Sequence, residues 1–180
     1  YYACECQSGA EAGCTAGNDA AAGTSPATAW RTYAKLQGAV ATSSCGDTFN
    51  FCEGGVFASG LSREWARASH DCSANPRVVR SYDPASFARR PRIEGDEAIF
   101  GLNASGAKGV TIRGLEIVCS GACDAGVGAI YGNVDKVVVD DVVVDGFNVC
   151  VQWGVNREMG VRNSTIQNCR VQGLIGPAGN

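Results

Sequence analysis

Acidic side chains in the second half of the chain suggest metal chemistry. Asp140, Asp141 and Asp145 follow one another closely, and carboxylate oxygens are the ligands that Ca²⁺ prefers. The run therefore predicts a calcium site, and calcium is the one cofactor that these residues suggest. The alternative is the solvated edge of a sheet, which we favour, because a tight backbone bend already accounts for Asp141.

Basic side chains in the same region suggest acid–base chemistry, since Arg or Lys can remove a proton from a bound substrate. The candidates, which no motif fixes, are Arg113, Lys136, Arg157 and Arg162. The alternative is structural, because Arg113, Asp140 and Arg162 occupy equivalent positions of a repeat. Opposite charges would then alternate along its outside, and we favour this charge ladder.

A second basic group lies earlier in the chain. It consists of Arg77, Arg80, Arg89, Arg90 and Arg92. These side chains could attract an acidic glycan or lie against the acidic residues that follow them in sequence. We expect the second arrangement, because the two regions carry opposite charge.

The ten cysteines and the one histidine limit which metal sites and nucleophiles the chain can contain. A single histidine, His70, excludes a multi-histidine metal site, and its neighbours form no recognised nucleophile motif, so we interpret it as a surface-loop residue. The cysteine content is typical of exported proteins, and it favours disulfides over zinc. Position suggests two pairs, Cys119 with Cys123 and Cys150 with Cys169. The full disulfide set is Cys4, Cys6, Cys14, Cys45, Cys52, Cys72, Cys119, Cys123, Cys150 and Cys169.

Charge and hydropathy exclude several classes of protein. Fifteen basic and eighteen acidic residues give a net charge of −3, which disfavours nucleic acid as a partner. A hydrophobic content of 45% is too high for intrinsic disorder. No stretch approaches the ~18 apolar residues of a membrane span. The cysteine content then leads us to expect a secreted or cell-surface protein.

An internal repeat predicts the elements that position these side chains. Val110–Ile117, Val137–Val144 and Met159–Ile166 align without a gap, with starts 27 and then 22 residues apart. A second short strand recurs at Ile130-Tyr131, Val151-Gln152 and Leu174-Ile175, with Ile99-Phe100 as an earlier member. Two strands that recur together every twenty-odd residues predict a β-solenoid with rungs about 4.8 Å apart.

Equivalent positions of the repeat predict its inside and its bends. Two columns are apolar and should point inward, namely Ile112 with Val139 and Val161, and Ile117 with Val144 and Ile166. Between them lies a column of Gly114, Asp141 and Asn163. These three residue types tolerate left-handed backbone angles, so the column predicts a tight bend between two strands of each coil.

The first half of the chain is less regular. Residues 1–28 show no period and read as irregular chain held by disulfides, and Thr28 offers an N-cap to a short helix over Ala29–Val40. Strands are expected at Phe49–Cys52, at Arg77–Tyr82 and around Ile93. The prediction is one domain, with an N-terminal segment and helix at 1–48, first coils with a loop insertion at 49–100, and regular coils at 101–180.

The coils and the N-terminal segment together resemble the right-handed parallel β-helix proteins of the pectate-lyase-like superfamily. In the N-terminal segment the likeness lies in Tyr1-Tyr2, Gly17-Asn18-Asp19, Gly23–Thr32 and Gly46-Asp47-Thr48. The resemblance implies an all-β fold, a right-handed parallel β-helix (solenoid) with an N-terminal capping helix and a disulfide-pinned irregular N-terminal segment. It also implies a polysaccharide partner, since many such proteins are lyases or hydrolases of acidic glycans.

Two functions follow from this resemblance. The first is an extracellular domain that binds or processes a polysaccharide. If it is catalytic, a cation would stabilise the uronate enolate while Arg or Lys removes the α-proton. The second is a non-catalytic adhesin or filament subunit. The repeat is still running at Leu174-Ile175, so its last rung would expose apolar surface, which predicts either a continuing chain or self-association through the C-terminal rung.

Overall fold

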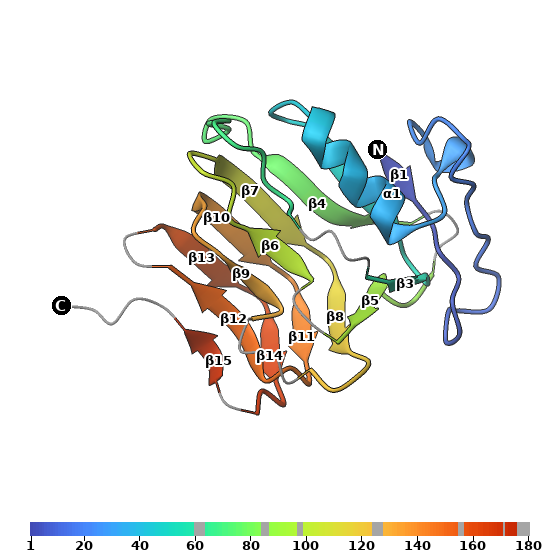
Figure 1. Cartoon of the computed structure of the whole chain (residues 1–180). Coiled ribbons are helices and arrows are strands. Elements are labelled where there is room, and N and C mark those ends of the chain that lie inside the picture. Colours follow the sequence, from blue (N-terminus) through green and yellow to red (C-terminus); the bar gives the residue numbers. More distant parts are fainter. Residues whose placement is uncertain are drawn as a thin grey trace.

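The computed structural model describes residues 1–59, 64–83, 87–96, 99–123, 128–154, 157–170 and 172–175. Within these ranges parallel strands dominate, and helix is confined to short segments near the N-terminus (Figure 1). The predicted all-β class is confirmed at this level. In the described part of the chain, no helix combines the length and apolar character needed to cross a membrane.

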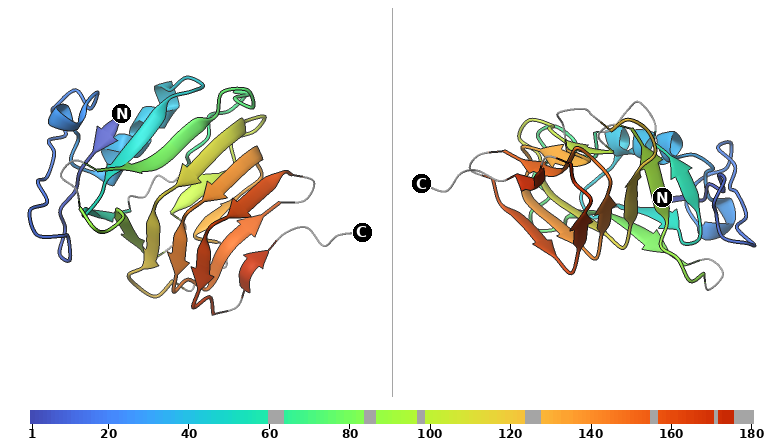
Figure 2. Two further views of the ribbon diagram at one scale, coloured as in Figure 1. Left: turned by 180° about the vertical axis from the view of Figure 1, so that it is seen from behind. Right: turned by 90° about the horizontal axis from the view of Figure 1, so that it is seen from below.

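The strands form three parallel sheets. Sheet A has the order β1-β2-β4-β7-β10-β13, sheet B β14-β11-β8-β5-β3, and sheet C β15-β12-β9-β6. From β4 onward the chain visits A, B and C in turn, and from β7 onward each strand pairs with the one three strands earlier (Figure 2). The bounds in sheet A are Tyr2–Ala3 (β1), Thr48–Cys52 (β2), Arg77–Tyr82 (β4), Lys108–Arg113 (β7), Asp135–Asp140 (β10) and Met159–Arg162 (β13). Those in sheet B are Val56–Ala58 (β3), Arg92–Gly95 (β5), Glu116–Cys119 (β8), Val143–Asp145 (β11) and Thr165–Gln167 (β14). Those in sheet C are Phe100–Leu102 (β6), Ile130–Gly132 (β9), Val149–Trp153 (β12) and Gln172–Ile175 (β15).

The strand register follows the sequence repeat, except that Phe100 and not Ile99 pairs with Ile130, so the predicted earlier member of the second strand is shifted by one residue. In sheet A, Val139 is paired with Ile112 on one side and Val161 on the other. In sheet B, Val144 lies between Ile117 and Ile166, and in sheet C Val151 lies between Ile130 and Leu174. Most of these apolar side chains are fully buried, whereas Val161 and Ile166 are only partly buried. The predicted inward columns are therefore confirmed. The last predicted rung is present as β15, and residues 176–180 lie outside the described residues.

The bend column between sheets A and B has the predicted backbone. Gly114, Asp141 and Asn163 have φ angles of +67°, +56° and +50°. At Gly114 a side chain would also be crowded, because a Cβ would lie 2.7 Å from the Ser81 Oγ. Glycine and short polar residues occupy the bend because they alone reach this conformation at low cost.

The bend can be tested by replacing Asn163. We expect Asn163→Val to be about 1–2 kcal/mol less stable than Asn163→Gly, because a β-branched side chain resists the left-handed region. Both variants lose the hydrogen bond from the Asn163 amide to Asp140, so their difference isolates the backbone effect. Urea unfolding followed by circular dichroism measures it. Equal stability of the two variants would contradict a strained bend.

The N-terminal helix is shorter than predicted. The expected helix over Ala29–Val40 is wrong at its start, since α1 spans Tyr33–Gly38 and continues as a 3-10 turn, η2, over Ala39–Thr42. Thr32, not Thr28, is the N-cap, and its Oγ1 accepts from the backbone N–H of Lys35. Thr28 instead ends a separate 3-10 turn, η1, at Pro26–Thr28. The reason is tertiary, because Trp30 pairs with Ala3 and stays extended.

Helix α1 packs on the end of the sheets away from β13–β15 (Figure 1). Tyr33 and Leu36 are fully buried there. The Tyr33 hydroxyl donates to the carbonyl of Ile99 at 2.6 Å and accepts from the indole N–H of Trp65 at 2.7 Å. The helix thus covers the apolar interior at this end and is tied to it by polar contacts.

All ten cysteines form disulfides. The pairs are Cys4–Cys52, Cys6–Cys14, Cys45–Cys72, Cys119–Cys123 and Cys150–Cys169. Both pairings suggested by position are present. Three of the five bridges lie in the first half, where fewer stacked strands hold the chain.

Candidate functional site

The predicted charge ladder lies at the bend between sheets A and B. Strand register places Arg80, Arg113, Asp140 and Arg162 in one column, on β4, β7, β10 and β13. An open groove of about 350 Å³ runs along it, which we call the charged groove. Its lining is Arg80, Ser81, Arg113, Gly114, Asp140 and Asp141.

Both aspartates of the charged groove already have partners. Asp140 accepts from the Asn163 amide at 2.9 Å and lies 3.2 Å from the Arg162 guanidinium, and these contacts hold the pKa of Asp140 below its usual range. Asp141 forms an ion pair with Arg90, as expected for the earlier basic group. Arg113 is exposed and makes no ion pair within the described part of the chain. It is the more exposed of the two arginines that line this groove, since Arg80 is partly buried and its Nε donates to the Oδ1 of Asn50.

The other two predicted bases lie elsewhere. Lys136 and Arg157 line a separate groove of about 500 Å³ at the start of β10 and β13. Lys136 forms an ion pair with Glu158, and this contact raises the pKa of the lysine. The four candidate bases are thus divided between two surfaces, so the structure does not assemble them into one catalytic set.

The predicted calcium ligands are not gathered around one point. Asp145 lies at the end of β11, where it accepts from the side-chain amides of Gln167 and Asn168 at 3.0 and 2.7 Å. Asp140 and Asp141 are held in their ion pairs. Among the described residues, these three carboxylates do not converge as a set of metal ligands.

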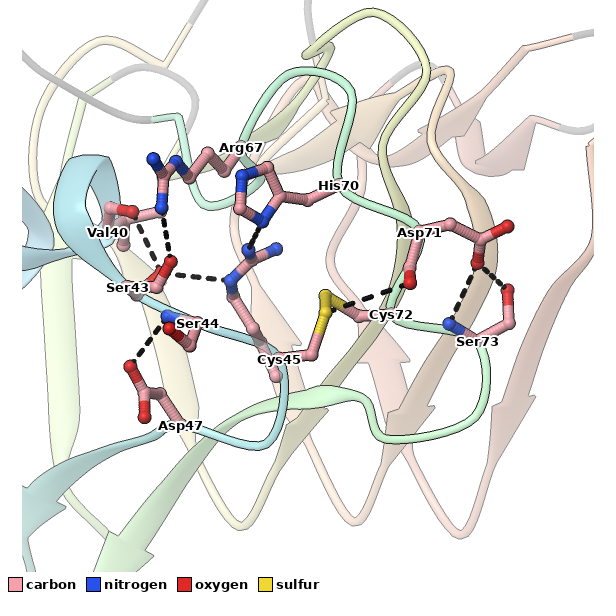
Figure 3. Close-up of a disulfide and its surroundings, with 11 residues drawn as sticks. Val40, Ser43, Ser44, Cys45, Asp47, Arg67, His70, Asp71, Cys72 and Ser73 are labelled. Atoms are coloured by element: carbon pink, nitrogen blue, oxygen red, sulfur yellow. Dashed lines mark hydrogen bonds between the residues drawn. A yellow bond between two sulfur atoms is a disulfide. The ribbon is translucent and has the colours of Figure 1, made fainter.

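His70 lies in a loop, as predicted, beside the Cys45–Cys72 disulfide (Figure 3). The ligand atoms of Cys45, His70 and Cys72 lie within 4.8 Å of one another, which resembles a metal cluster. However, both sulfurs are committed to the disulfide. The His70 Nδ1 lies 3.1 Å from Arg77 Nη2, and a guanidinium can only donate. This contact occupies the lone pair of Nδ1, so the ring is not arranged to bind a metal.

A further groove lies at the ends of the strands of sheet C. It has a volume of about 340 Å³, and we call it the aromatic–amide groove. Its lining is Asn103, Tyr131, Gly132, Asn133, Gln152, Trp153 and Gly154. Register stacks Tyr131 on Gln152, and Gly132 on Trp153. Rings and amides from successive turns of the chain therefore meet on one surface.

The two glycines that line this groove, Gly132 and Gly154, allow neighbouring turns of the chain to pack closely. A Cβ on Gly132 would lie 2.2 Å from the carbonyl oxygen of Leu102, and one on Gly154 would lie 1.6 Å from the Oδ1 of Asn133. No larger residue fits at either position without displacing its neighbour. Asn133 in turn donates to the Oδ1 of Asn103 at 3.4 Å. The amide groups are thereby stacked from one turn to the next.

Two polar groups at this groove are unusual. Trp153 is 6% exposed, and its indole N–H is covered yet has no hydrogen-bond partner in the described ranges. Burying such a donor costs about 1–3 kcal/mol. The Glu64 carboxylate accepts from the backbone N–H groups of Asn103 and Ala66, and burial raises the pKa of Glu64. Glu64 therefore fixes the loop that presents Asn103.

Sequence reasoning did not identify the aromatic–amide groove. Tyr131 and Gln152 belong to the recurring second strand, but the repeat alone gives them no role in a site. The signal is their position, since each follows an inward-pointing residue, Ile130 or Val151, and so must face outward. Glu64 carried no local signal, because its place beside Gly101 depends on an isolated bridge between distant segments.

Comparison with known proteins found no match to this chain. No protein-family model matches the sequence, and no curated protein or solved structure matches it either. The candidate sites are therefore judged by their own geometry.

Proposed function

We propose that the chain is a right-handed parallel β-helix of the pectate-lyase-like type and that it binds a polysaccharide outside the cell. Support for the fold comes from the strict rotation through three parallel sheets and from the left-handed bend column. Five disulfides in 180 residues support a secreted or cell-surface location, where such bonds persist.

The observation that carries glycan binding is the aromatic–amide groove on sheet C. A sugar has apolar C–H faces, which stack on aromatic rings such as Tyr131, and hydroxyls, which pair with amides. Asn103, Asn133 and Gln152 supply both donors and acceptors. Because equivalent positions repeat from rung to rung, the groove suits a ligand that is itself a repeating chain. We therefore assign the glycan to this surface.

Replacing Tyr131 tests the assignment. After a panel of galacturonate, glucan and xylan hexasaccharides has identified a ligand by calorimetry, we expect Tyr131→Ala to weaken its binding about tenfold through loss of stacking. Tyr131→Phe keeps the ring and should bind within about threefold of the parent. Absence of binding across the panel, or unchanged affinity of Tyr131→Ala, would contradict the proposal.

A second candidate function, β-elimination of an acidic glycan, is favoured by Arg113 in the charged groove. This exposed cation lies in register with Arg80, so a uronate could meet one arginine as neutraliser and another as base. Incubation with polygalacturonate, alginate and glycosaminoglycans, with and without calcium, should then release unsaturated ends. If neither unsaturated nor reducing ends form on any of these polymers, the catalytic version fails.

The structural alternative is self-association through the β13–β15 end. Val161 and Ile166 are partly exposed there, whereas Val139 and Val144 one rung earlier are each 1% exposed. A second copy, or a further turn of the same chain, would bury them. Sedimentation across a concentration series should show association that Val161→Lys abolishes. A strictly monomeric protein at high concentration would contradict this alternative.

A further inference from the structure

A cluster of cationic donors lies beside the Cys45–Cys72 disulfide (Figure 3). Arg77 is at its base and is fully buried, with 0% of its surface exposed. Its Nε donates to the Oγ of Ser43 at 2.9 Å, and its Nη2 lies 3.1 Å from the Nδ1 of His70. Its Nη1 has no hydrogen-bond partner within the described residues. Arg77 thus holds a positive charge in the interior with only neutral groups bonded to it.

A second guanidinium lies above Arg77. Arg67 is half-buried and donates from Nη1 to the carbonyl oxygen of Ser43 at 2.7 Å. Because the Nδ1 of His70 accepts from Arg77, the neutral ring carries its hydrogen on Nε2. In Figure 3 this edge of the imidazole faces Arg67. Burial together with the charges of Arg67 and Arg77 lowers the pKa of His70. Two donors therefore face each other across the rim of the cluster.

The neighbouring carboxylates do not neutralise these charges directly. The Oδ2 of Asp47 accepts from the backbone N–H of Ser44 at 2.8 Å, and this carboxylate attracts the charge of Arg77 without forming an ion pair with it. Asp71 accepts from Ser73 and forms an ion pair with Lys108 at 3.3 Å. Neither Arg67 nor Arg77 makes an ion pair within the ranges that the structure describes. Charges removed from water in this way are costly unless an opposite charge accompanies them.

We propose that Arg67, His70 and Arg77 form a binding site for a single oxyanion group of the phosphate or sulfate type. The group accepts hydrogen bonds from the Arg67 guanidinium and from the Nε2–H of His70, both of which lie at the rim. Arg77 is buried and does not contact the oxyanion. It contributes through its positive charge and by fixing the hydrogen of the imidazole on Nε2. A tetrahedral oxyanion has several acceptor oxygens and can bridge two donors that cannot bond to each other. This site is separate from both glycan grooves.

His70 is the sole histidine, so its imidazole resonance in a proton NMR spectrum reports on the site without assignment. We expect inorganic phosphate or sulfate, added at constant ionic strength against chloride, to shift this resonance saturably. The bound charge should raise the pKa of His70 by about 1. A shift that grows without saturation, or equals that of chloride, overturns the proposal. The readout does not involve glycan, so it fails or succeeds independently of the proposed function.

Substitution locates the anion. Arg67→Gln should weaken phosphate binding at least about tenfold, in keeping with the loss of a charge-assisted contact. Arg31→Gln, at an exposed arginine outside the cluster, should bind like the parent. Equal phosphate affinity of Arg67→Gln and Arg31→Gln would overturn the assignment of the site. Should Arg67→Gln fail to fold, the titration of the parent protein decides alone. Methyl phosphate distinguishes a phosphate ester from the free ion as the ligand. If methyl phosphate shifts the His70 resonance with the same saturation as inorganic phosphate, the site accepts an ester-borne group. If methyl phosphate causes no shift, the site binds the free ion.

Discussion

Trp65→Ala is expected to lower the free energy of unfolding by about 3–5 kcal/mol, the range seen when a large buried aromatic residue is removed. Trp65 is 1% exposed and packs against the rings of Phe49 and Phe100, with centroids 5.7 and 5.2 Å away. Its indole N–H donates to the Tyr33 hydroxyl. The substitution therefore leaves a cavity between the N-terminal helix and the sheets and removes a buried hydrogen bond.

Urea unfolding followed by far-ultraviolet circular dichroism measures this loss without relying on tryptophan fluorescence. Trp65→Phe is the matched control, because it keeps most of the ring volume and loses chiefly the hydrogen bond, at a cost of about 1–2 kcal/mol. A loss below about 1 kcal/mol for Trp65→Ala would mean that the helix is not held by this cluster.

Removal of the Cys4–Cys52 disulfide should cost about 4 kcal/mol, because the bond closes a loop with a sequence separation of 48 and limits the unfolded chain accordingly. Cys4 and Cys52 are almost fully buried, at 5% and 0% exposure. The bond ties the irregular start of the chain to β2. The double variant Cys4→Ala with Cys52→Ala should therefore unfold at markedly lower urea concentration.

The Cys6–Cys14 disulfide provides the comparison. Its sequence separation is 8, so its double alanine variant should lose only about 2.5 kcal/mol. Both variants remove one bond in the same N-terminal region, so their difference reflects loop length together with the deeper burial of Cys4 and Cys52. If removal of Cys6–Cys14 proves the more damaging, the loop-closure argument does not describe this protein.

The regular parallel strands of the second half could be predicted from the sequence because their signal is repeated. Each inward position, such as Ile112 or Val139, recurs one rung later in the same chemical class, and the bend at Gly114 recurs as Asp141 and Asn163. The register follows, since slipping by one residue would turn an apolar column outward. Because several copies carry the same pattern, an atypical residue in one copy does not change the prediction, whereas a single segment offers no such check.

The features that could not be predicted from the sequence depend on contacts between distant segments. The helix starts at Tyr33 instead of Ala29 because the chain at Trp30 is taken into a bridge with Ala3. The charged groove was anticipated in part, since Arg113 and Asp140 belong to the repeat. The aromatic–amide groove also needs Glu64 to hold the Asn103 loop, and the cationic cluster needs residues from three separate segments, which no local pattern brings together.

The rotation of the chain through three sheets has a consequence for how such a protein can change over evolutionary time. Because a turn contacts chiefly the turn before and the turn after it, duplication or loss of one complete turn preserves the pairing of all others. Each added turn would also extend the grooves by one position. If the surface binds a polysaccharide as we propose, gene duplication of a twenty-odd residue unit would therefore alter the length of polymer that it accommodates, without a new fold.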